Sequence, residues 1–545
     1  MDEALVKIRD LRVSFGRGDA KTRILKGIDI DLANGEILGI IGESGSGKTM
    51  TGLSLLRLLP QTAHVEAVKM FFAGEELQQK SGGEFDALRG VQLAMVFQDP
   101  VGSFNPCKTI GWHFAQVLRR VGETGELRDK SVQLLRDVGV KRAEETMFLY
   151  PHQLSGGMLQ RALIALVLAL RPKLIVADEP TTNLDKIVEK QVLDLFLSLQ
   201  RRLGASVIFV THDMPVAASF CHRIAVMNAG EIVEVGETAQ IFGRPRHPYT
   251  RRLIDTALKL AGANGRPKEN QSHRARQAAR FAEEPLYRVR DLTISFPHSN
   301  RHGSFRALDG VSFDVMPGEI LGILGESGSG KTTLGRSLLR LYEPAGGRIE
   351  YRGRDITHER ERSLRSIRRE MQMVFQDPGG SFSPRRTMGQ ALREALAMAR
   401  HPRAELRRRA VSLLERVGLT AEHGDRYAHE LSGGQLQRVA IARAIALEPR
   451  VIVADEAVSK LDVSVRAEIL TLLGDVQREI GMAIIFITHD LDVARYICDR
   501  IAVMYHGKLL EIGHTEEIFT RPAAGYTQSL LGTHQNLAKL IGAVA

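Results

Sequence analysis

The chain has 545 residues, 43% hydrophobic and 25% charged, which is typical of a globular protein with several domains and excludes a disordered or fibrous one. Its net charge of +10 permits an acidic partner such as nucleic acid or an anionic membrane, but the positive residues are spread along the chain. The longest apolar run, near residues 162–170, falls far short of the ~18 residues that a membrane-spanning helix needs.

Cysteine usage and the first residues indicate the compartment. The cysteines Cys107, Cys221 and Cys498 are far apart and odd in number, which suits a reducing compartment and gives no zinc or iron–sulfur pattern. The first ten residues, MDEALVKIRD, are too charged for a secretory signal. We therefore expect a cytosolic protein, or one that lies on a membrane without crossing it.

The first strong pattern in chain order is an apolar strand, EILGII, followed by the glycine-rich segment GESGSGKT. A strand, a GxxxxGK[ST] loop and a helix together predict a P-loop, whose backbone amides face the phosphates of a nucleotide. The helix that follows adds free N–H groups and a positive dipole end. We expect Lys48 to reach the β- and γ-phosphates and Thr49 to hold Mg²⁺. The predicted nucleotide-binding residues are Gly42, Glu43, Ser44, Gly45, Ser46, Gly47, Lys48 and Thr49.

The next motifs enclose a predicted helical subdomain. Gln98 follows the apolar MVF segment, and its amide oxygen is a candidate ligand of Mg²⁺ that senses the nucleotide. Residues 111–121 and 129–138 have a helical pattern. The LSGG segment then precedes an apolar helical run, which predicts a second anion site at a helix N-terminus formed by Ser155, Gly156 and Gly157.

Two buried strands with polar ends follow. LIVADE ends in Asp178, which we expect to hold Mg²⁺, and Glu179, which we expect to act as the general base. SVIFVTHD ends at His212, either a structural histidine or a contact of the γ-phosphate. The later segment RIAVMNAGEIVEVG predicts a small antiparallel hairpin pair at the end of this half.

The polar segment 263–284 contains Gly, Pro and five arginine or lysine residues, and it lacks an apolar period, so we predict a linker. Its positive charge suits a solvated tether, or else a contact with nucleic acid or lipid. After it the whole series of motifs occurs again, from LSGG at Leu154 and Leu431 to THD at Thr211 and Thr488 with a constant offset of 277 residues. We therefore predict one domain in residues 1–262 and its duplicate in 285–545.

The second copy supplies the same candidate residues. Its P-loop comprises Gly325, Glu326, Ser327, Gly328, Ser329, Gly330, Lys331, Thr332 and Thr333. Its other candidates are Gln376 for Mg²⁺, the anion site Ser432, Gly433 and Gly434, the acids Asp455 for Mg²⁺ and Glu456 for the base, and His489.

In this order the motifs resemble the ATP-binding cassette of ABC proteins, twice, over about 500 residues. The resemblance implies an α/β fold of two tandem P-loop NTPase domains, each with an α-helical and a small antiparallel β subdomain. It also implies that each ATP lies between the P-loop of one cassette and the LSGG segment of the other. By position, Phe15 and Phe296 match an aromatic residue that stacks on adenine, although either is equally suited to the core.

Some positions depart from the family pattern. Met158 replaces the usual glutamine after LSGG, whereas the second half keeps Gln435, and Ala457 replaces the usual proline that Pro180 supplies in the first half. Neither change removes a predicted phosphate ligand or catalytic acid. We expect both sites to hydrolyse ATP, at rates that can differ.

The biological role has three alternatives: the energising subunit of a membrane importer, a soluble ribosome-associated factor of the ABC-F type, and a DNA-repair or chromosome ATPase. The segments QDPVGSFNP and QDPGGSFSP, and later RHPYTRRLI and AAGYTQSLL, resemble importers of oligopeptides, dipeptides and nickel. The linker is shorter than in the ribosome factors, and no long coiled coil interrupts either copy. We therefore predict an ATPase that powers import of peptides, nickel or metal chelates from the cytoplasmic face of the inner membrane. Its expected partners are two permease subunits and, indirectly, a solute-binding protein, with no nucleic acid.

Overall fold

The structure is a computed structural model that describes residues 4–16, 21–181, 184, 186–262, 284–297, 304–459, 461–533 and 537–544. The chain divides into two compact units. The first runs to Ala257 and also includes α21 (Leu537–Val544), while the second starts at Leu258. The predicted linker lies outside the described residues except for Glu284, so its role and the boundaries 1–262 and 285–545 remain predictions.

A six-stranded sheet forms the centre of the first unit, in the order β11-β10-β3-β9-β8-β7. The strands β3, β8 and β9 are buried along their whole length, as the apolar runs predicted for a parallel sheet covered on both faces. The strands are β3 (Ile37–Ile41), β7 (Leu93–Val96), β8 (Leu174–Asp178), β9 (Ser206–Thr211), β10 (Arg223–Asn228) and β11 (Glu231–Glu237).

The predicted hairpin at the end of the half is present, since β10 pairs antiparallel with β11. It does not form a unit of its own, however, because β10 is apolar through its middle and pairs parallel with β3 in the central sheet. The antiparallel subdomain instead comes from the N-terminal strands, whose apolar face packs on the central sheet. These strands are β1 (Val6–Phe15), β2 (Thr22–Leu32), β4 (Ala63–Glu66), β5 (Lys69–Phe72) and β6 (Glu75–Glu76).

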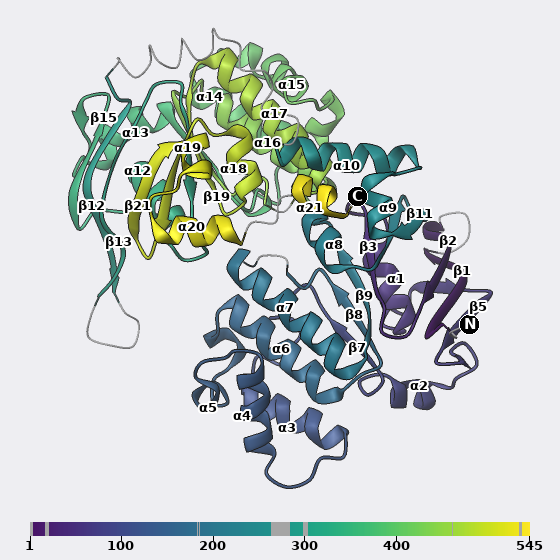
Figure 1. The fold of residues 1–545 in the computed structure, drawn as a ribbon. Helices are drawn as coiled ribbons and strands as arrows, with labels where there is room; N and C mark the ends of the chain where they lie inside the picture. Colours follow the sequence, from purple (N-terminus) through teal and green to yellow (C-terminus); the bar gives the residue numbers. More distant parts are fainter. Residues whose placement is uncertain are drawn as a thin grey trace. The chain divides into compact units, whose positions relative to one another are not determined.

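The predicted helical subdomain is confirmed. The helices α3, α4 and α6 pack together, and Figure 1 shows them with α5 at the end of the first unit that lies away from β1 and β2. The helices are α1 (Lys48–Leu55), α2 (Gly82–Leu88), α3 (Ile110–Arg120), α4 (Leu127–Asp137), α5 (Ala143–Thr146), α6 (Gly156–Leu170), α7 (Lys186–Leu203), α8 (Met214–Phe220), α9 (Thr238–Gly243) and α10 (Pro248–Leu260).

The second unit repeats this plan with the sheet order β17-β18-β19-β14-β20-β21. Its strands are β12 (Tyr287–Pro297), β13 (Ser304–Val315), β14 (Ile320–Leu324), β15 (Gly346–Tyr351), β16 (Arg354–Asp355), β17 (Met371–Val374), β18 (Val451–Asp455), β19 (Ala483–Thr488), β20 (Arg500–Tyr505) and β21 (Lys508–His514). Its helices are α12 (Lys331–Leu338), α13 (Glu361–Glu370), α14 (Met388–Met398), α15 (Leu406–Arg416), α16 (Gly433–Ile445), α17 (Val463–Ile480), α18 (Leu491–Ile497), α19 (Thr515–Thr520) and α20 (Gly525–Gly532).

The last helix of the chain belongs to the first unit. There α21 packs on α8 and α9, and its first residue, Leu537, is buried. Within the described ranges, no helix has both the length and the apolar composition needed to cross a membrane.

Candidate nucleotide sites and the groove beside the Gln loop

The first glycine-rich loop connects β3 to α1, as predicted. Gly47, with a φ of 103°, turns the chain into α1, and a Cβ on Gly42 would lie 2.2 Å from the Met227 carbonyl oxygen. Lys48 is buried, and its Nζ donates to the carbonyl oxygens of Gly42 at 2.8 Å and Glu43 at 2.9 Å. The lysine is thus held across the inside of the loop.

The end of β8 lies beside this loop. The Thr49 Oγ1 donates to Asp178 Oδ1 at 3.0 Å, so the hydroxyl and the carboxylate lie next to each other. Burial raises the pKa of Asp178 to about 6, although the hydrogen bond from Thr49 acts in the opposite direction and lowers the pKa. A hydroxyl and a carboxylate are oxygen donors of the kind that Mg²⁺ binds.

Glu179 follows Asp178 with an unusual backbone. Its φ of 47° is left-handed, which is rare for a residue other than glycine, and its backbone N–H donates to Val210 O on β9 at 2.9 Å. Its two carboxylate oxygens contact His212 Nδ1 at 3.0 Å and Gln98 Nε2 at 2.8 Å. The fold therefore brings the predicted acid, histidine and glutamine together.

The second unit repeats the arrangement. Lys331 Nζ donates to Gly325 O at 2.8 Å, and Thr332 Oγ1 donates to Asp455 Oδ1 at 3.0 Å. Glu456 has a φ of 46°, and its carboxylate contacts His489 Nδ1 at 3.2 Å and Gln376 Nε2 at 2.6 Å.

The charge of Glu456 is stabilised by its neighbours. Burial alone would raise the pKa of this carboxyl, but the bond and the charge of His489, with Lys331 and Gln376, lower it overall. A charged carboxylate next to an imidazole is a pair that can accept and hold a proton.

Each LSGG segment begins a helix. Ser155 Oγ accepts from Met158 N at the start of α6, and Ser432 Oγ accepts from Gln435 N at the start of α16. The second glycine of each segment is crowded, since a Cβ on Gly157 would lie 3.1 Å from Val188 and one on Gly434 would lie 2.5 Å from Val465. The remaining positions of the two segments are Gly156, which faces open space, and Gly433.

The two aromatic candidates are partly buried. Phe15 packs against the core of the first unit, and Phe296 packs against the core of the second with its ring 5.2 Å from that of Tyr342. Their role in stacking on adenine stays a prediction. The loop that follows Glu179 is only partly described, since Thr181 and Leu184 are the only described residues between Pro180 and Lys186. In the matching loop of the second unit, Lys460 lies outside the described residues.

The residues of the loop fit a triphosphate. Ser46 Oγ is buried without a hydrogen-bond partner among the described residues, and the Lys48 ammonium lies on the inner side of the loop beside the Gly42 and Glu43 carbonyl oxygens. A buried hydroxyl without a partner costs free energy, which a phosphate oxygen would recover. The Thr49–Asp178 pair fits Mg²⁺ on the same grounds.

Two tyrosines reach the loops from far along the chain. Tyr249 OH accepts from the Glu43 N–H at 3.3 Å, and Tyr526 OH accepts from the Glu326 N–H at 3.3 Å. Both tyrosines lie in the repeated YT segments RHPYTRRLI and AAGYTQSLL, but a YT pair alone does not predict a contact with the loop.

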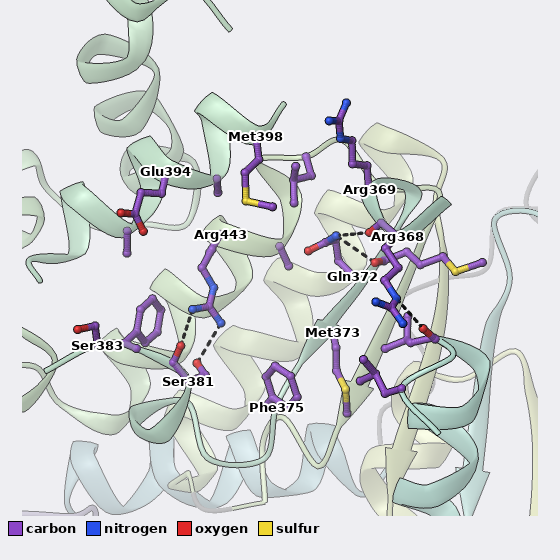
Figure 2. A pocket seen from close by; sticks show the side chains of 18 of the residues that line it. Arg368, Arg369, Gln372, Met373, Phe375, Ser381, Ser383, Glu394, Met398 and Arg443 are labelled. Atoms are coloured by element: carbon purple, nitrogen blue, oxygen red, sulfur yellow. Dashed lines mark hydrogen bonds between the residues drawn. The ribbon is translucent and has the colours of Figure 1, made fainter. Parts of the chain in front are cut away.

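A groove lies beside residues 376–384 of the second unit, the segment that begins with Gln376 and that we call the Gln loop. Its cavity volume is about 720 Å³. Arg443 of α16 reaches into it and donates to Ser381 O at 2.7 Å and Ser381 Oγ at 3.0 Å, as Figure 2 shows. Met373 and Phe375 line the apolar part, and α14 contributes Met398.

The groove is strongly basic. Its charged lining residues are the single acid Glu394, which pairs with Arg386, and the arginines Arg365, Arg368, Arg369, Arg386 and Arg443. Arg365 and Arg369 are exposed on α13, while Arg368 is tied to the carbonyl oxygens of Leu339 and Arg340.

Comparison with known proteins agrees with this geometry. Residues 25–182 and 308–459 match the ABC transporter family, and residues 233–283 match the C-terminal region of oligopeptide/dipeptide transporters. Glutathione import ATP-binding proteins GsiA of Escherichia coli O157:H7 and Shigella sonnei are 42% identical, covering 97% of this chain and 89% of theirs. Among solved structures, the ATP-binding cassette MJ0796 bound to ADP and Pi is 29% identical over 42% of this chain and 99% of its own, with a TM-score of 0.40.

Two P-loops, each with an acidic strand end, a histidine, a glutamine and an LSGG helix, define an ATPase of the cassette type. The chain belongs to the ABC transporter family, as the ATP-hydrolysing subunit of an importer with two fused cassettes. The prediction of an importer is confirmed and the ribosome-associated alternative is wrong, since the chain matches importer subunits over almost its whole length.

Proposed function

We propose that this chain uses two MgATP sites to drive import of small peptides, glutathione included, through two permease subunits at the cytoplasmic face of the inner membrane. The observation that carries the proposal is the repeated cluster of Thr49, Asp178, Glu179, His212 and Gln98, which occurs in both units with matching contacts. The peptide class is supported by the match to oligopeptide/dipeptide transporters and by the GsiA relatives. No finding favours nickel over peptides.

In each site the loop amides and the lysine bind the phosphates, and the threonine and aspartate hold Mg²⁺. The ion, when bound, neutralises charge on the β- and γ-phosphates. The glutamate takes a proton from the attacking water, and the histidine and the glutamine hold its carboxylate in position. The other assigned residues of the sites are Ser44, Gly45, Ser327, Gly328, Ser329, Gly330 and Thr333.

We further propose that the Ser155 and Ser432 helices each complete the site of the other cassette. Support comes from their position at the N-termini of α6 and α16, since a helix N-terminus attracts anions and each half thus has a second candidate anion site besides its P-loop. On this proposal Ser155 serves the site of Lys331, and Ser432 serves the site of Lys48.

The pairing of the cassettes has a direct test. Ser155→Arg with Lys331→Ala should damage one site and leave about half of the ATP hydrolysis if the two sites act independently, whereas Ser155→Arg with Lys48→Ala should damage both. Steady-state ATP hydrolysis of the three single and the two double variants measures this. The reverse pattern would show that each cassette completes its own site.

The groove of the second unit is our proposed docking site for a cytoplasmic helix of a permease. Its apolar floor suits the apolar face of an amphipathic helix, and its arginines suit acidic residues on the flanks of that helix. On this proposal the chain is attached to the membrane through such a partner.

Co-expression with the adjoining permease genes tests the transport role. We expect the chain to purify with two permeases from membranes, and reconstituted vesicles to take up a labelled di- or tripeptide in the presence of ATP and a solute-binding protein. Uptake of nickel but of no peptide would contradict the proposed substrate class.

A further inference from the structure

In each unit, a helix far along the chain from the glycine-rich loop contacts that loop. Tyr249 is the second residue of α10 and Tyr526 is the second residue of α20, and each hydroxyl accepts from a loop N–H at 3.3 Å. The distance is at the long end of the range for N–H···O bonds, but it is the same in both units. Some 200 residues separate each tyrosine from its loop in sequence.

One peptide group connects the tyrosine to the loop lysine. The Glu43 N–H and the Gly42 carbonyl belong to the same planar peptide unit. The N–H donates to Tyr249 OH, and the carbonyl oxygen accepts from Lys48 Nζ at 2.8 Å. Since N–H and C=O point in opposite directions across a trans peptide, fixing one end fixes the direction of the other.

The same connection exists in the second unit. Glu326 N–H donates to Tyr526 OH, and the Gly325 carbonyl oxygen accepts from Lys331 Nζ at 2.8 Å. The tyrosine surroundings differ, because Tyr526 packs on the ring of Tyr505 whereas Tyr249 lies beside Arg252. The hydroxyl contact therefore persists where the packing around the ring has changed.

The helices that carry the tyrosines are anchored by a second repeated contact. Glu234 of β11 accepts from the N–H groups of Arg246 and His247 at 2.9 and 3.0 Å. Glu511 of β21 accepts from those of Ala523 and Ala524 at 2.8 and 3.1 Å. Each carboxylate thus ties down the residues just before its helix and sets where the tyrosine points.

We propose that Tyr249 and Tyr526 are positioning residues of the two ATP sites, which set the orientation of the first peptide of each P-loop and so the position of its lysine. Each acts through the peptide group and not on the nucleotide itself. The inference rests on the proposed assignment of Lys48 and Lys331 to the phosphates. It gives the C-terminal segment of each cassette a direct influence on nucleotide affinity.

The test uses the full-length chain with Tyr249→Phe, Tyr526→Phe and the double variant. Phenylalanine keeps the ring and removes only the hydroxyl group, so the unfolding temperature should stay at the wild-type value. We expect the KM for ATP and the Kd for ATP to rise about three- to tenfold in the double variant, with kcat within twofold, because one neutral hydrogen bond is lost per site. Tyr496→Phe in α18 is the matched control and should leave these constants unchanged.

A double variant with wild-type KM and Kd overturns the inference, and so does one whose unfolding temperature falls while the affinity stays the same, because the role is then structural. Lys48→Ala with Lys331→Ala separates this result from a failure of the proposed site. If ATP affinity is insensitive to the lysines, the phosphate assignment is wrong. If it falls with the lysine variants but not with the tyrosine variants, only the role of the tyrosines is refuted.

Discussion

The contacts within the two candidate nucleotide sites match closely, whereas the surfaces beside the Gln loops of the two cassettes differ. The threonine–aspartate bond is 3.0 Å in both, and the bond from the lysine to the first loop glycine is 2.8 Å in both. Around the groove, however, the first cassette has Leu166 where the second has Arg443, and Arg120 where the second has Met398.

These two exchanges change the shape and charge of the surface. In the first cassette Arg120 of α3 donates to the backbone oxygens of Asp86 and Arg89, so it bridges from the helical subdomain to the segment around α2. In the second cassette Met398 is 62% exposed and cannot form such a bridge. The comparison indicates that the contacts within the candidate ATP sites are kept in both halves, whereas the surface beside the Gln loop differs between them.

The largest effect should come from the proposed general bases. Glu179→Gln with Glu456→Gln should lower ATP hydrolysis about 100-fold or more, because glutamine keeps the shape but cannot accept the proton. If the cassettes are equal, each single variant should retain about half of the activity. Steady-state hydrolysis measures this, with the exposed pair Glu66→Gln and Glu361→Gln as the control. Normal turnover in the double variant would show that the bases are assigned wrongly.

The proposed Mg²⁺ ligands should show the next largest effect. Asp178→Asn and Asp455→Asn should each raise the Mg²⁺ concentration needed at the altered site roughly tenfold, since an anionic ligand becomes neutral. The two variants should be equivalent because both aspartates accept from the loop threonine at 3.0 Å. Titration of Mg²⁺ at saturating ATP tests this, and an effect of only one variant would break the equality of the sites.

The sequence was sufficient to predict which residues meet at the candidate ATP sites. Each motif combines a fixed residue type with a fixed place at the end of a strand or the start of a helix. Thr49, Asp178 and Glu179 meet because the carboxyl ends of parallel strands share one edge of the sheet. The contact of Tyr249 could not be predicted, since it depends on how α10 packs some 200 residues after its loop. The arginines of α13 were also beyond prediction, because a charged helix face is normally solvated.

The groove offers the sharpest test of the difference between the cassettes. Arg365→Glu with Arg369→Glu should weaken binding of an acidic, amphipathic helical peptide about fivefold, because two exposed charges are reversed. The matched pair in the first cassette, Ala87→Glu with Val91→Glu, should leave this binding unchanged. Fluorescence anisotropy at low and high salt measures it, with a lysine-substituted peptide as the control. Equal binding of both peptides would mean that charge does not select the partner of this groove.

The smallest effect concerns the start of the LSGG helices. In the second cassette Gln435 and Ser432 form a reciprocal capping box, in which the Gln435 side chain accepts from the Ser432 N–H at 3.1 Å. Met158 cannot supply the second of these bonds in the first cassette. We expect Gln435→Met to cost about 0.5–1 kcal/mol of stability and Met158→Gln to add a similar or smaller amount. Thermal unfolding of the two variants should therefore shift by about 1–3 °C in opposite directions. Shifts in the same direction would show that packing around residue 158, and not the cap, determines the stability of this helix start.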